Sequence, residues 1–152
     1  TAIRLSDEFG IDLVIEHATA GHKIADQLAS RGIPAAVGPS ITARVKVELK
    51  DRTYQTPALL HQAGVRFAMV TDHPFLPING LRLEAALAIR EGLPYEIALR
   101  AITLTPAEII GVKSRVGSIE KGKDADIVIF SGDPFDIQTK VEKVFIHGKL
   151  VS

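Results

Sequence analysis

The chain has 152 residues, and a hydrophobic content of 46% is enough for one buried core. Because 18 Lys and Arg residues balance 18 Asp and Glu residues, the net charge disfavours nucleic acid or an anionic membrane as a partner. The absence of cysteine excludes disulfides, thiolate metal sites and a cysteine nucleophile, so any metal must bind through histidine and carboxylate groups.

The first residues predict a helix. Residues 1–10 have a helical pattern without the basic and apolar regions of a signal peptide, and no apolar run approaches membrane-spanning length. These features favour a soluble, cytoplasmic protein. A start inside a helix, without Met or a cap, is unusual for a natural N-terminus, so we expect a further segment upstream of Thr1.

The first half of the chain alternates helical and strand patterns. Apolar residues spaced for a helix occupy 2–9, and the β-branched run Asp12–Glu16 then predicts a strand that ends at His17. A second helix is expected to end at Arg31, and a second strand follows over Ile33–Val37.

A long polar segment, residues 38–56, comes after this strand. A loop of such length inside a compact domain is more often functional than idle. Thr56–Gln62 is then predicted as a short helix, and Val65–Val70 as a strand that leads into Asp72. This order of helices and strands is typical of a parallel sheet or barrel.

The middle of the chain predicts helices alone. Three helical stretches are expected over residues 81–92, 94–103 and 105–110. In the last one, Thr105 is the expected N-cap and Pro106 the first helical residue.

The character of the sequence changes near Val112. Short β segments separated by turn residues are expected over 117–119, 126–131, 141–147 and 150–151. So few strands rarely form a stable sheet alone, and this tail is therefore expected to join a second, mostly β unit. We divide the chain accordingly into residues 1–112 and residues 113–152.

His17 and Asp72 follow two of the expected strands. In parallel α/β folds the ligand site lies at the carboxyl ends of the strands, where the loops converge. Imidazole and carboxylate groups bind zinc-like cations, and a carboxylate can also take a proton from activated water. The alternative stays open: a lone His after a strand is more often a hydrogen-bonded structural residue, and a lone Asp near Pro often forms a turn.

His22 and His73 are further candidates near this mouth. His22 follows His17 by five residues and either lines the mouth or caps the next helix. His73 is a candidate for contact with the substrate, and a structural role is an equal alternative for it. A serine or cysteine triad and a phosphate-binding loop find no support in the sequence.

Five segments carry a composite pattern. Four are Leu13–His17 (LVIEH), Gly32–Pro39 (GIPAAVGP), Val70–Pro74 (VTDHP) and Ala101–Val112 (AITLTPAEIIGV). The fifth, Arg115–Val128 (RVGSIEKGKDADIV), contains a specific G-x-I-x-x-G-K-x-A-D motif. Together they resemble the amidohydrolase superfamily, in particular its imidazolonepropionase-like branch, and the resemblance covers essentially the whole chain.

The resemblance implies an α/β fold: the C-terminal part of a (β/α)8 TIM-like barrel plus strands of a small β-sandwich domain. Residues 12–16, 33–37 and 67–70 would be barrel strands six, seven and eight. His17 and Asp72 would then be the metal ligands of strands six and eight. The other ligands of the family, an H-x-H pair and residues of strands four and five, have no counterpart in this chain.

The resemblance further implies hydrolysis of a non-peptide, possibly cyclic, amide or related C–N bond. One or two divalent metal ions, with zinc expected, would activate water. His17 would hold the metal, and Asp72 would pass the water proton to the leaving nitrogen. The segment Ile41–Gln55 would overhang the mouth and help to select the substrate.

With two ligands only, the chain by itself is expected to be inactive or to bind metal weakly. The alternative is a non-catalytic or degenerate amidohydrolase-like module that acts only in assembly with a partner chain. The expected partners are a small-molecule substrate and either a second copy of the chain or the missing N-terminal half. Half of a barrel leaves open strand edges and an apolar face, which favour dimerisation or aggregation.

Overall fold

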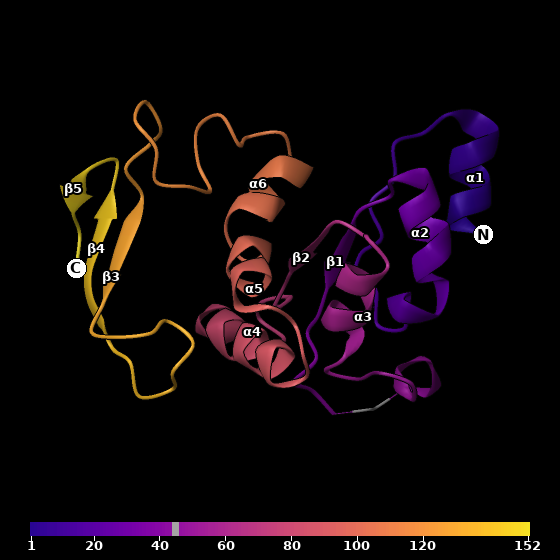
Figure 1. The fold of residues 1–152 in the computed structure, drawn as a ribbon, viewed down its shortest axis with the longest axis horizontal. Helices are drawn as coiled ribbons and strands as arrows, with labels where there is room; N and C mark the ends of the chain where they lie inside the picture. Colours follow the sequence, from indigo (N-terminus) through magenta and orange to yellow (C-terminus); the bar gives the residue numbers. More distant parts are fainter. Residues whose placement is uncertain (44–45) are drawn as a thin grey trace.

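The computed structural model describes residues 1–43 and 46–152. The helical elements, with η marking a 3-10 helix, are α1 (Ala2–Phe9), η1 (Gly21–Ile24), α2 (Ala25–Arg31), η2 (Val47–Leu49), α3 (Thr56–Gln62), η3 (Ile78–Gly80), α4 (Leu81–Arg90), α5 (Tyr95–Ala101) and α6 (Leu104–Ile109). The strands are β1 (Ala35–Val37), β2 (Phe67–Met69), β3 (Ile127–Phe130), β4 (Val141–Ile146) and β5 (Lys149–Leu150). Figure 1 shows α1 and the N-terminus at one end of the molecule and the strands β3, β4 and β5 with the C-terminus at the other.

The first two α-helices end at glycines. Gly10 after α1 and Gly32 after α2 have φ values of 63° and 65°, the left-handed conformation in which a helix commonly stops. The helix expected over residues 2–9 is confirmed. The second expected helix is also confirmed, and it begins as the 3-10 turn η1 before it continues as α2.

Three short segments run side by side in parallel. β1 pairs with β2 so that Ala36 lies opposite Ala68, and Ile15 forms a single parallel bridge to Ala35 on the other side of β1. Two expected strands are thus confirmed in shortened form, whereas the strand expected over residues 12–16 is reduced to this one bridge. Because the segments point the same way, their carboxyl ends meet at one edge.

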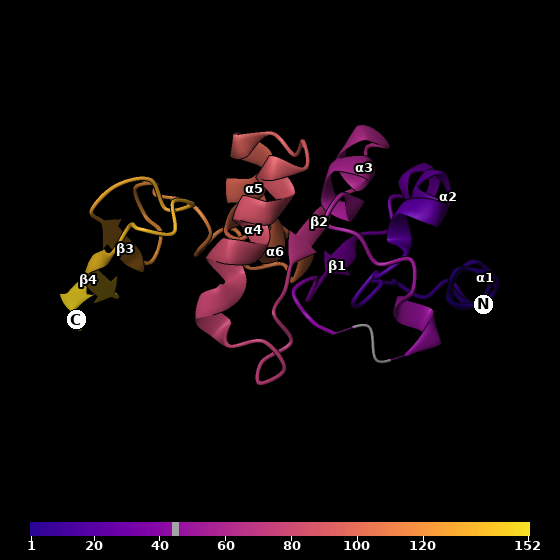
Figure 2. The same cartoon turned by 90° about the horizontal axis from the view of Figure 1, so that it is seen from below.

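The core lies between these strands and the helices that cover them. Every residue of β1 and β2 is buried, as expected for parallel strands packed on both faces. Helices α3, α4, α5 and α6 contact β2, and Figure 2 shows β1 and β2 between α4 and α5 on the left and α2 on the right. Leu28 and Leu60 are fully buried here, and burial of each such side chain contributes about 2 kcal/mol. No helix within residues 1–43 and 46–152 is long and apolar enough to cross a membrane.

The C-terminal strands form a separate antiparallel sheet in the order β3-β4-β5. Many of its apolar side chains remain exposed, including Val128 at 44% and Leu150 at 60%. Arg82 of α4 ties this sheet to the helices. Its guanidinium carbon lies 4.7 Å from the centroid of the Phe130 ring, and its Nε donates to the carbonyl of Pro134.

One expected strand, over residues 117–119, is wrong. Gly117 has a φ of 92° and packs against α6, where a Cβ atom on it would lie 2.9 Å from Cβ of Ala107 and from Cα of Leu104. The chain therefore turns against the helix at this point instead of extending. The strands expected around residues 126–131 and 141–147 are confirmed as β3 and β4.

The expected N-cap of α6 is also wrong. The helix begins at Leu104 with Thr103 as its N-cap residue, and Thr105 is buried inside the first turn. The Thr103 hydroxyl donates to the carbonyl of Leu99 at 2.6 Å, so the chain passes from α5 to α6 in a tight turn. Pro106 fits the first turn of α6 because N–H groups there need no helical partner.

Candidate active site

His17 and Asp72 lie face to face at the carboxyl ends of the parallel segments. Nε2 of His17 is 3.1 Å from Oδ2 of Asp72, although 55 positions separate the two residues in sequence. His17 follows the bridge residue Ile15, Asp72 follows β2, and β1 lies between them. Their side chains are about half exposed, at 54% and 49%. The structure therefore brings together the two residues that the sequence singled out.

The backbone at both residues adopts a conformation that is rare outside glycine. φ is 61° at His17, 33° at Ala18 and 51° at Asp72. A residue held in such a conformation costs of order 1–3 kcal/mol and persists only where its surroundings impose it. The backbone is therefore constrained at both strand ends, as it also is at His147 in the turn between β4 and β5.

Gly38 lies between the two strand ends. Its N–H donates to the carbonyl of His17 at 3.3 Å, and a Cβ atom on it would lie 2.1 Å from the carbonyl oxygen of Val70. With a φ of 129°, this position is restricted to glycine by both space and conformation. Sequence analysis did not select Gly38, although a glycine directly after a predicted strand and before Pro39 was the available signal.

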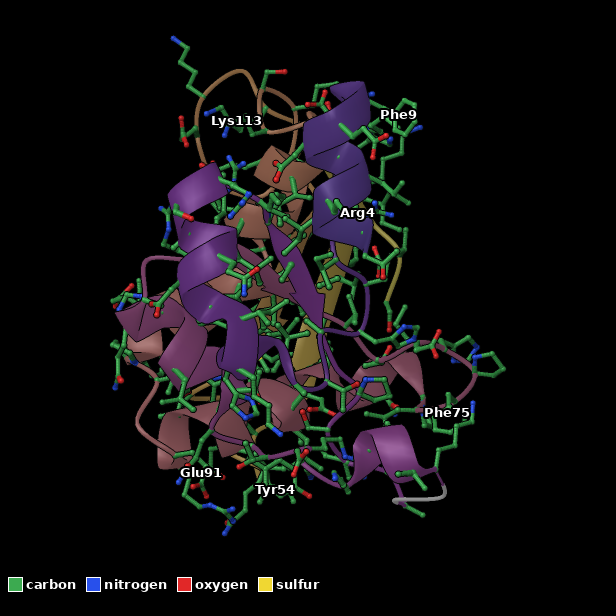
Figure 3. The ribbon with its side chains drawn as sticks, turned by 90° about the vertical axis from the view of Figure 1, so that its right-hand side faces the viewer. Arg4, Phe9, Tyr54, Phe75, Glu91 and Lys113 are labelled. Carbon is green, nitrogen blue, oxygen red and sulfur yellow. The ribbon has the colours of Figure 1, made fainter. Side chains whose placement is uncertain are left out.

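A hollow of about 380 Å³ opens beside the His17 and Asp72 pair. Its other lining residues are Glu16, Met69, Val70, Thr71, Ile78 and Leu81. Most of these are apolar, and Ile78 remains 72% exposed at the rim. Phe75, from the loop between β2 and η3, is 62% exposed and projects from the edge of the molecule (Figure 3).

A second, tighter hollow also includes His17, and its other walls are more polar. They come from the segment that follows β1 and from the start of α3: Thr19, Val37, Gly38, Pro39, Ser40, Arg52, Thr53 and Thr56. This second hollow is too narrow to admit a water molecule, so only the apolar hollow beside His17 has room for a substrate group.

His22 and His73 lie outside both sets of lining residues among the described part of the chain. Nδ1 of His22 is 3.0 Å from Oγ1 of the buried Thr56, which joins η1 to α3. The His73 side chain is exposed directly after Asp72. Contact with the substrate stays a prediction for both residues.

The segment Ile41–Gln55, expected to overhang the mouth, makes hydrogen bonds both to neighbouring elements and within itself. Nζ of Lys23 is 2.5 Å from Oδ2 of Asp51, and this hydrogen bond lowers the pKa of the Asp51 carboxyl. Arg52 is buried and donates to the hydroxyl and carbonyl of Thr42. Residues 44 and 45 of this segment lie outside the described residues.

Glu84 of α4 is a buried acid that sequence analysis missed. It is 2% exposed, and its Oε1 accepts hydrogen bonds from the backbone N–H groups of Ser40 at 2.7 Å and Ile41 at 2.9 Å. Burial raises the pKa of this carboxyl despite these bonds. The available signal was helical spacing, because Glu84 falls in register with the buried Ala85 and Ala88.

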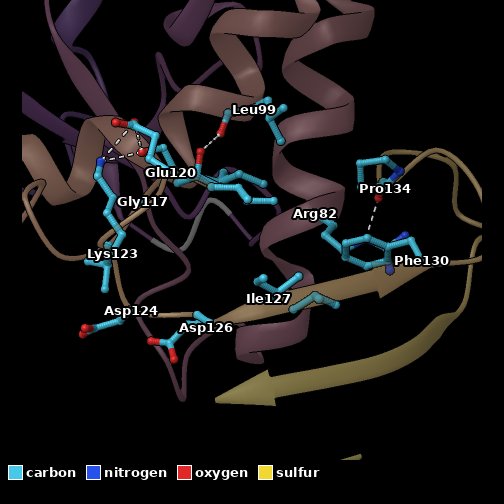
Figure 4. Close-up of a pocket in the computed structure, with 17 residues that line it drawn as sticks. Arg82, Leu99, Gly117, Glu120, Lys123, Asp124, Asp126, Ile127, Phe130 and Pro134 are labelled. Atoms are coloured by element: carbon cyan, nitrogen blue, oxygen red, sulfur yellow. Dashed lines mark hydrogen bonds and ion pairs between the residues drawn. The ribbon is translucent and has the colours of Figure 1, made fainter. Parts of the chain in front are cut away.

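Another cavity, of about 530 Å³, lies between α5, the loop after α6 and β3 (Figure 4). Arg82, Ile127 and Phe130 contribute to its walls, and it shares no lining residue with the two hollows at His17. Among the described residues that line it there is no histidine, the side chain that both hollows at the strand ends share. We therefore assign the chemistry to the strand ends instead.

Within residues 1–43 and 46–152, no three His, Asp or Glu residues lie close enough together to hold a metal ion. Between them, His17 and Asp72 offer two donor atoms to a metal, Nε2 and Oδ2. A catalytic zinc site normally has three protein ligands. On their own, the described residues therefore do not form such a site.

The chain is similar to known amidohydrolases in both sequence and structure. A model of the amidohydrolase family matches residues 5–151. The amidohydrolase tasK of Hapsidospora irregularis is 36% identical over 103 residues, which are 68% of this chain and 10% of that protein. An imidazolonepropionase of Treponema denticola is 36% identical over 114 residues, covering 68% of this chain and 27% of the relative.

The solved structure of an amidohydrolase from Thermotoga maritima MSB8 matches 99% of this chain with a TM-score of 0.96 and 48% identity. The match covers 39% of that chain. The present chain thus spans well under half the length of these relatives.

Proposed function

The chain belongs to the amidohydrolase family, and from this premise we propose that it contributes two active-site residues to a metal-dependent hydrolase of non-peptide C–N bonds. The observation that carries the proposal is the 3.1 Å approach of His17 Nε2 to Asp72 Oδ2 at the strand ends. Both residues also have a left-handed backbone, a constrained conformation that is consistent with this role.

The donor geometry fits a shared cation. Two ligands of a tetrahedral zinc ion, each at ~2.1 Å, lie about 3.4 Å apart, close to the separation of the His17 and Asp72 donor atoms. His17 Nε2 and Asp72 Oδ2 would hold the ion together with ligands from elsewhere in the full-length protein. When bound, the ion lowers the pKa of a coordinated water and polarises the scissile carbonyl.

The residues of this chain then carry out the proton transfer and shape the site around the substrate. Asp72, half exposed at the rim, takes a proton at a carboxylate oxygen and delivers it to the leaving nitrogen. The apolar wall of Ile78, Leu81 and Met69 excludes water on one side and favours an uncharged substrate group there. This arrangement suits a small amide, open-chain or cyclic, such as the substrate class that the name imidazolonepropionase indicates for the relative.

The placement of the chain in the larger fold belongs to the same proposal. Ile15, β1 and β2 would be strands six, seven and eight of a TIM-like barrel, and β3, β4 and β5 would be part of a small β-sandwich. The parallel order Ile15–β1–β2 supports the first assignment, and the separate antiparallel sheet supports the second. Zinc as the metal and a cytoplasmic location are further parts of the proposal.

The second candidate function is a degenerate module that works only in assembly with a partner chain. It is favoured by the presence of just two candidate ligands among the described residues. The two functions differ in whether the full-length protein binds a metal stoichiometrically and hydrolyses an amide.

The test uses the full-length protein and its Asp72→Asn variant. Metal content is measured by elemental mass spectrometry, and hydrolysis is measured on a panel of N-substituted formamides, cyclic imidazolones and simple carboxamides. The wild type should contain metal and cleave at least one class. Asp72→Asn should lower kcat about 10²–10⁴-fold, the usual contribution of a positioned acid–base group.

Asp26→Asn is the matched control, because Asp26 is an exposed carboxylate on α2. It should leave kcat and metal content unchanged. A metal-free wild type whose amide hydrolysis is unaffected by Asp72→Asn would contradict the proposed function.

A further inference from the structure

Glu84 is a buried carboxylate for which the proposed chemistry has no use. Its carboxylate is 2% exposed in the first turn of α4, on the helix that follows the Asp72 loop. One oxygen, Oε1, accepts hydrogen bonds from the N–H groups of Ser40 at 2.7 Å and Ile41 at 2.9 Å. Burying a carboxylate is costly, so a side chain that served packing alone would be expected to be apolar.

The two N–H groups belong to the segment that leaves β1 toward the mouth of the site. Ser40 lines the polar hollow that also includes His17, together with Gly38 and Pro39. Two residues after Ser40, the hydroxyl and the carbonyl of Thr42 accept hydrogen bonds from the guanidinium of the buried Arg52. Residues 40–42 are therefore held by a buried carboxylate on one side and a buried guanidinium on the other.

Glu84 also spans two structural units. Its helix, α4, continues from the strand and loop that carry Asp72, whereas its hydrogen-bond partners continue from β1. Ser40 and Glu84 are 44 positions apart in sequence. The carboxylate thus fixes the wall beside His17 relative to the element that presents Asp72.

We propose that Glu84 is a positioning residue, which holds the Gly38–Ile41 backbone, the wall beside His17, in place. Its effect on catalysis rests on the proposed amide hydrolysis, whereas its effect on the backbone of residues 40 and 41 does not. The Glu84 carboxylate accepts hydrogen bonds from the N–H groups of this wall, and the wall in turn donates to the carbonyl of His17 through the N–H of Gly38. The loss of Glu84 should therefore disturb the placement of His17 and lower kcat/KM.

The first measurement is amide hydrogen exchange, resolved by residue, in the wild type, Glu84→Ala and Glu84→Gln. In Glu84→Ala the amides of Ser40 and Ile41 should exchange at least about 10-fold faster, because they lose their acceptor. The ladder amides of Ala35 and Val70, which donate to Arg66 and Val37, should keep their rates. Unchanged exchange at residues 40 and 41, or equal acceleration everywhere, would overturn the proposal.

The glutamine variant keeps the proposal testable if Glu84→Ala does not fold. The glutamine side chain carries no charge but keeps a carbonyl acceptor, so Glu84→Gln should accelerate exchange at residues 40 and 41 only several-fold. If Glu84→Ala does not fold, wild-type exchange rates in Glu84→Gln overturn the proposal. Glu96→Gln, which removes an exposed carboxylate from α5, is the matched control and should change nothing.

The second measurement is steady-state hydrolysis by the full-length protein, with the best amide from the panel above. Glu84→Ala should lower kcat/KM about 10-fold or more, and Glu84→Gln, which keeps an acceptor, should restore it in part. An unchanged kcat/KM in both variants would overturn the positioning role in catalysis. If the wild type cleaves no amide, the proposed function fails, and hydrogen exchange alone decides whether Glu84 positions the wall.

Discussion

Gly38 lies so close to Val70 that a Cβ atom on Gly38 would be 2.1 Å from the Val70 carbonyl oxygen. The same glycine donates its N–H to the carbonyl of His17. Val70 is two residues before Asp72, so this one contact sets how closely the two strand ends approach. The close approach of His17 and Asp72 thus depends on Gly38, which has no side chain to push the neighbouring strand ends apart.

Gly38→Ala should therefore destabilise the protein and separate the candidate pair. The added methyl group meets backbone that cannot rotate away, and the φ of 129° is unfavourable for alanine. We expect a loss of about 3 kcal/mol or more in the free energy of unfolding, measured by urea denaturation. Gly64→Ala is the control: Gly64 has a φ of 80° but no atom within 4 Å of the added Cβ, so it should cost only about 1–2 kcal/mol. Equal losses in the two variants would contradict the steric explanation.

The buried carboxyl of Glu84 predicts a pH dependence of stability. Burial raises its folded-state pKa above the ordinary value of 4.5, so the folded protein binds this proton more tightly than the unfolded chain does. This stabilising contribution is fully present below pH 4.5 and is lost as the pH rises through the folded-state pKa.

Glu84→Gln should consequently gain stability relative to the wild type as the pH rises from 4.5. The comparison is made by urea denaturation at a series of pH values, and it cancels the opposite contribution of Asp51, whose pKa is lowered by Lys23. A stability difference that stays constant with pH, or that changes in the other direction, would show that burial does not dominate at Glu84.

Arg82 predicts how the C-terminal sheet is attached. Its guanidinium stacks on Phe130 and donates to the carbonyls of Asp136 at 3.2 Å and Thr139 at 3.3 Å, as well as to that of Pro134. Arg82→Ala should weaken this attachment by roughly 2 kcal/mol and speed proteolysis within residues 131–140. Arg82→Lys should restore it only in part, because an ammonium group lacks the planar fork.

The control for Arg82 is Arg4→Ala. Arg4 is 75% exposed and lies 4.0 Å from Glu8, an ion pair expected to contribute less than about 0.5 kcal/mol. Its removal should leave the cleavage rate in residues 131–140 unchanged. If Arg82→Ala behaved like Arg4→Ala, the sheet would have to be held by other contacts, such as the hydrogen bond from Tyr95 to Asp133.

The 152-residue chain should self-associate. Phe9 and Ile11 are 65% and 57% exposed at the end of α1, an apolar exposure that monomers usually avoid. Size exclusion with light scattering should give a mass above that of the monomer, and Phe9→Ser with Ile11→Ser should lower it. Ile137→Ser, which changes an exposed residue in the loop between β3 and β4, should have no effect. A monomer at all concentrations would refute the expectation.

The sequence determined by itself those features whose signals lie within a few residues. The left-handed glycines that end α1 and α2 confirm the expected helices, and the apolar runs before His17 and Asp72 led to the two candidate residues. Local signals failed where a neighbouring element decides the conformation. Gly117 turns because it packs on α6, and Thr105 lies inside the helix that it was expected to cap.

The tertiary structure alone decided what these residues meet. That His17 and Asp72 approach within 3.1 Å, and that Glu84 receives the N–H groups of a segment about 44 positions earlier, depends on how β1, β2 and α4 pack. A buried carboxylate and an exposed one look alike in a helical sequence, because the difference between them is the partner supplied from another part of the chain.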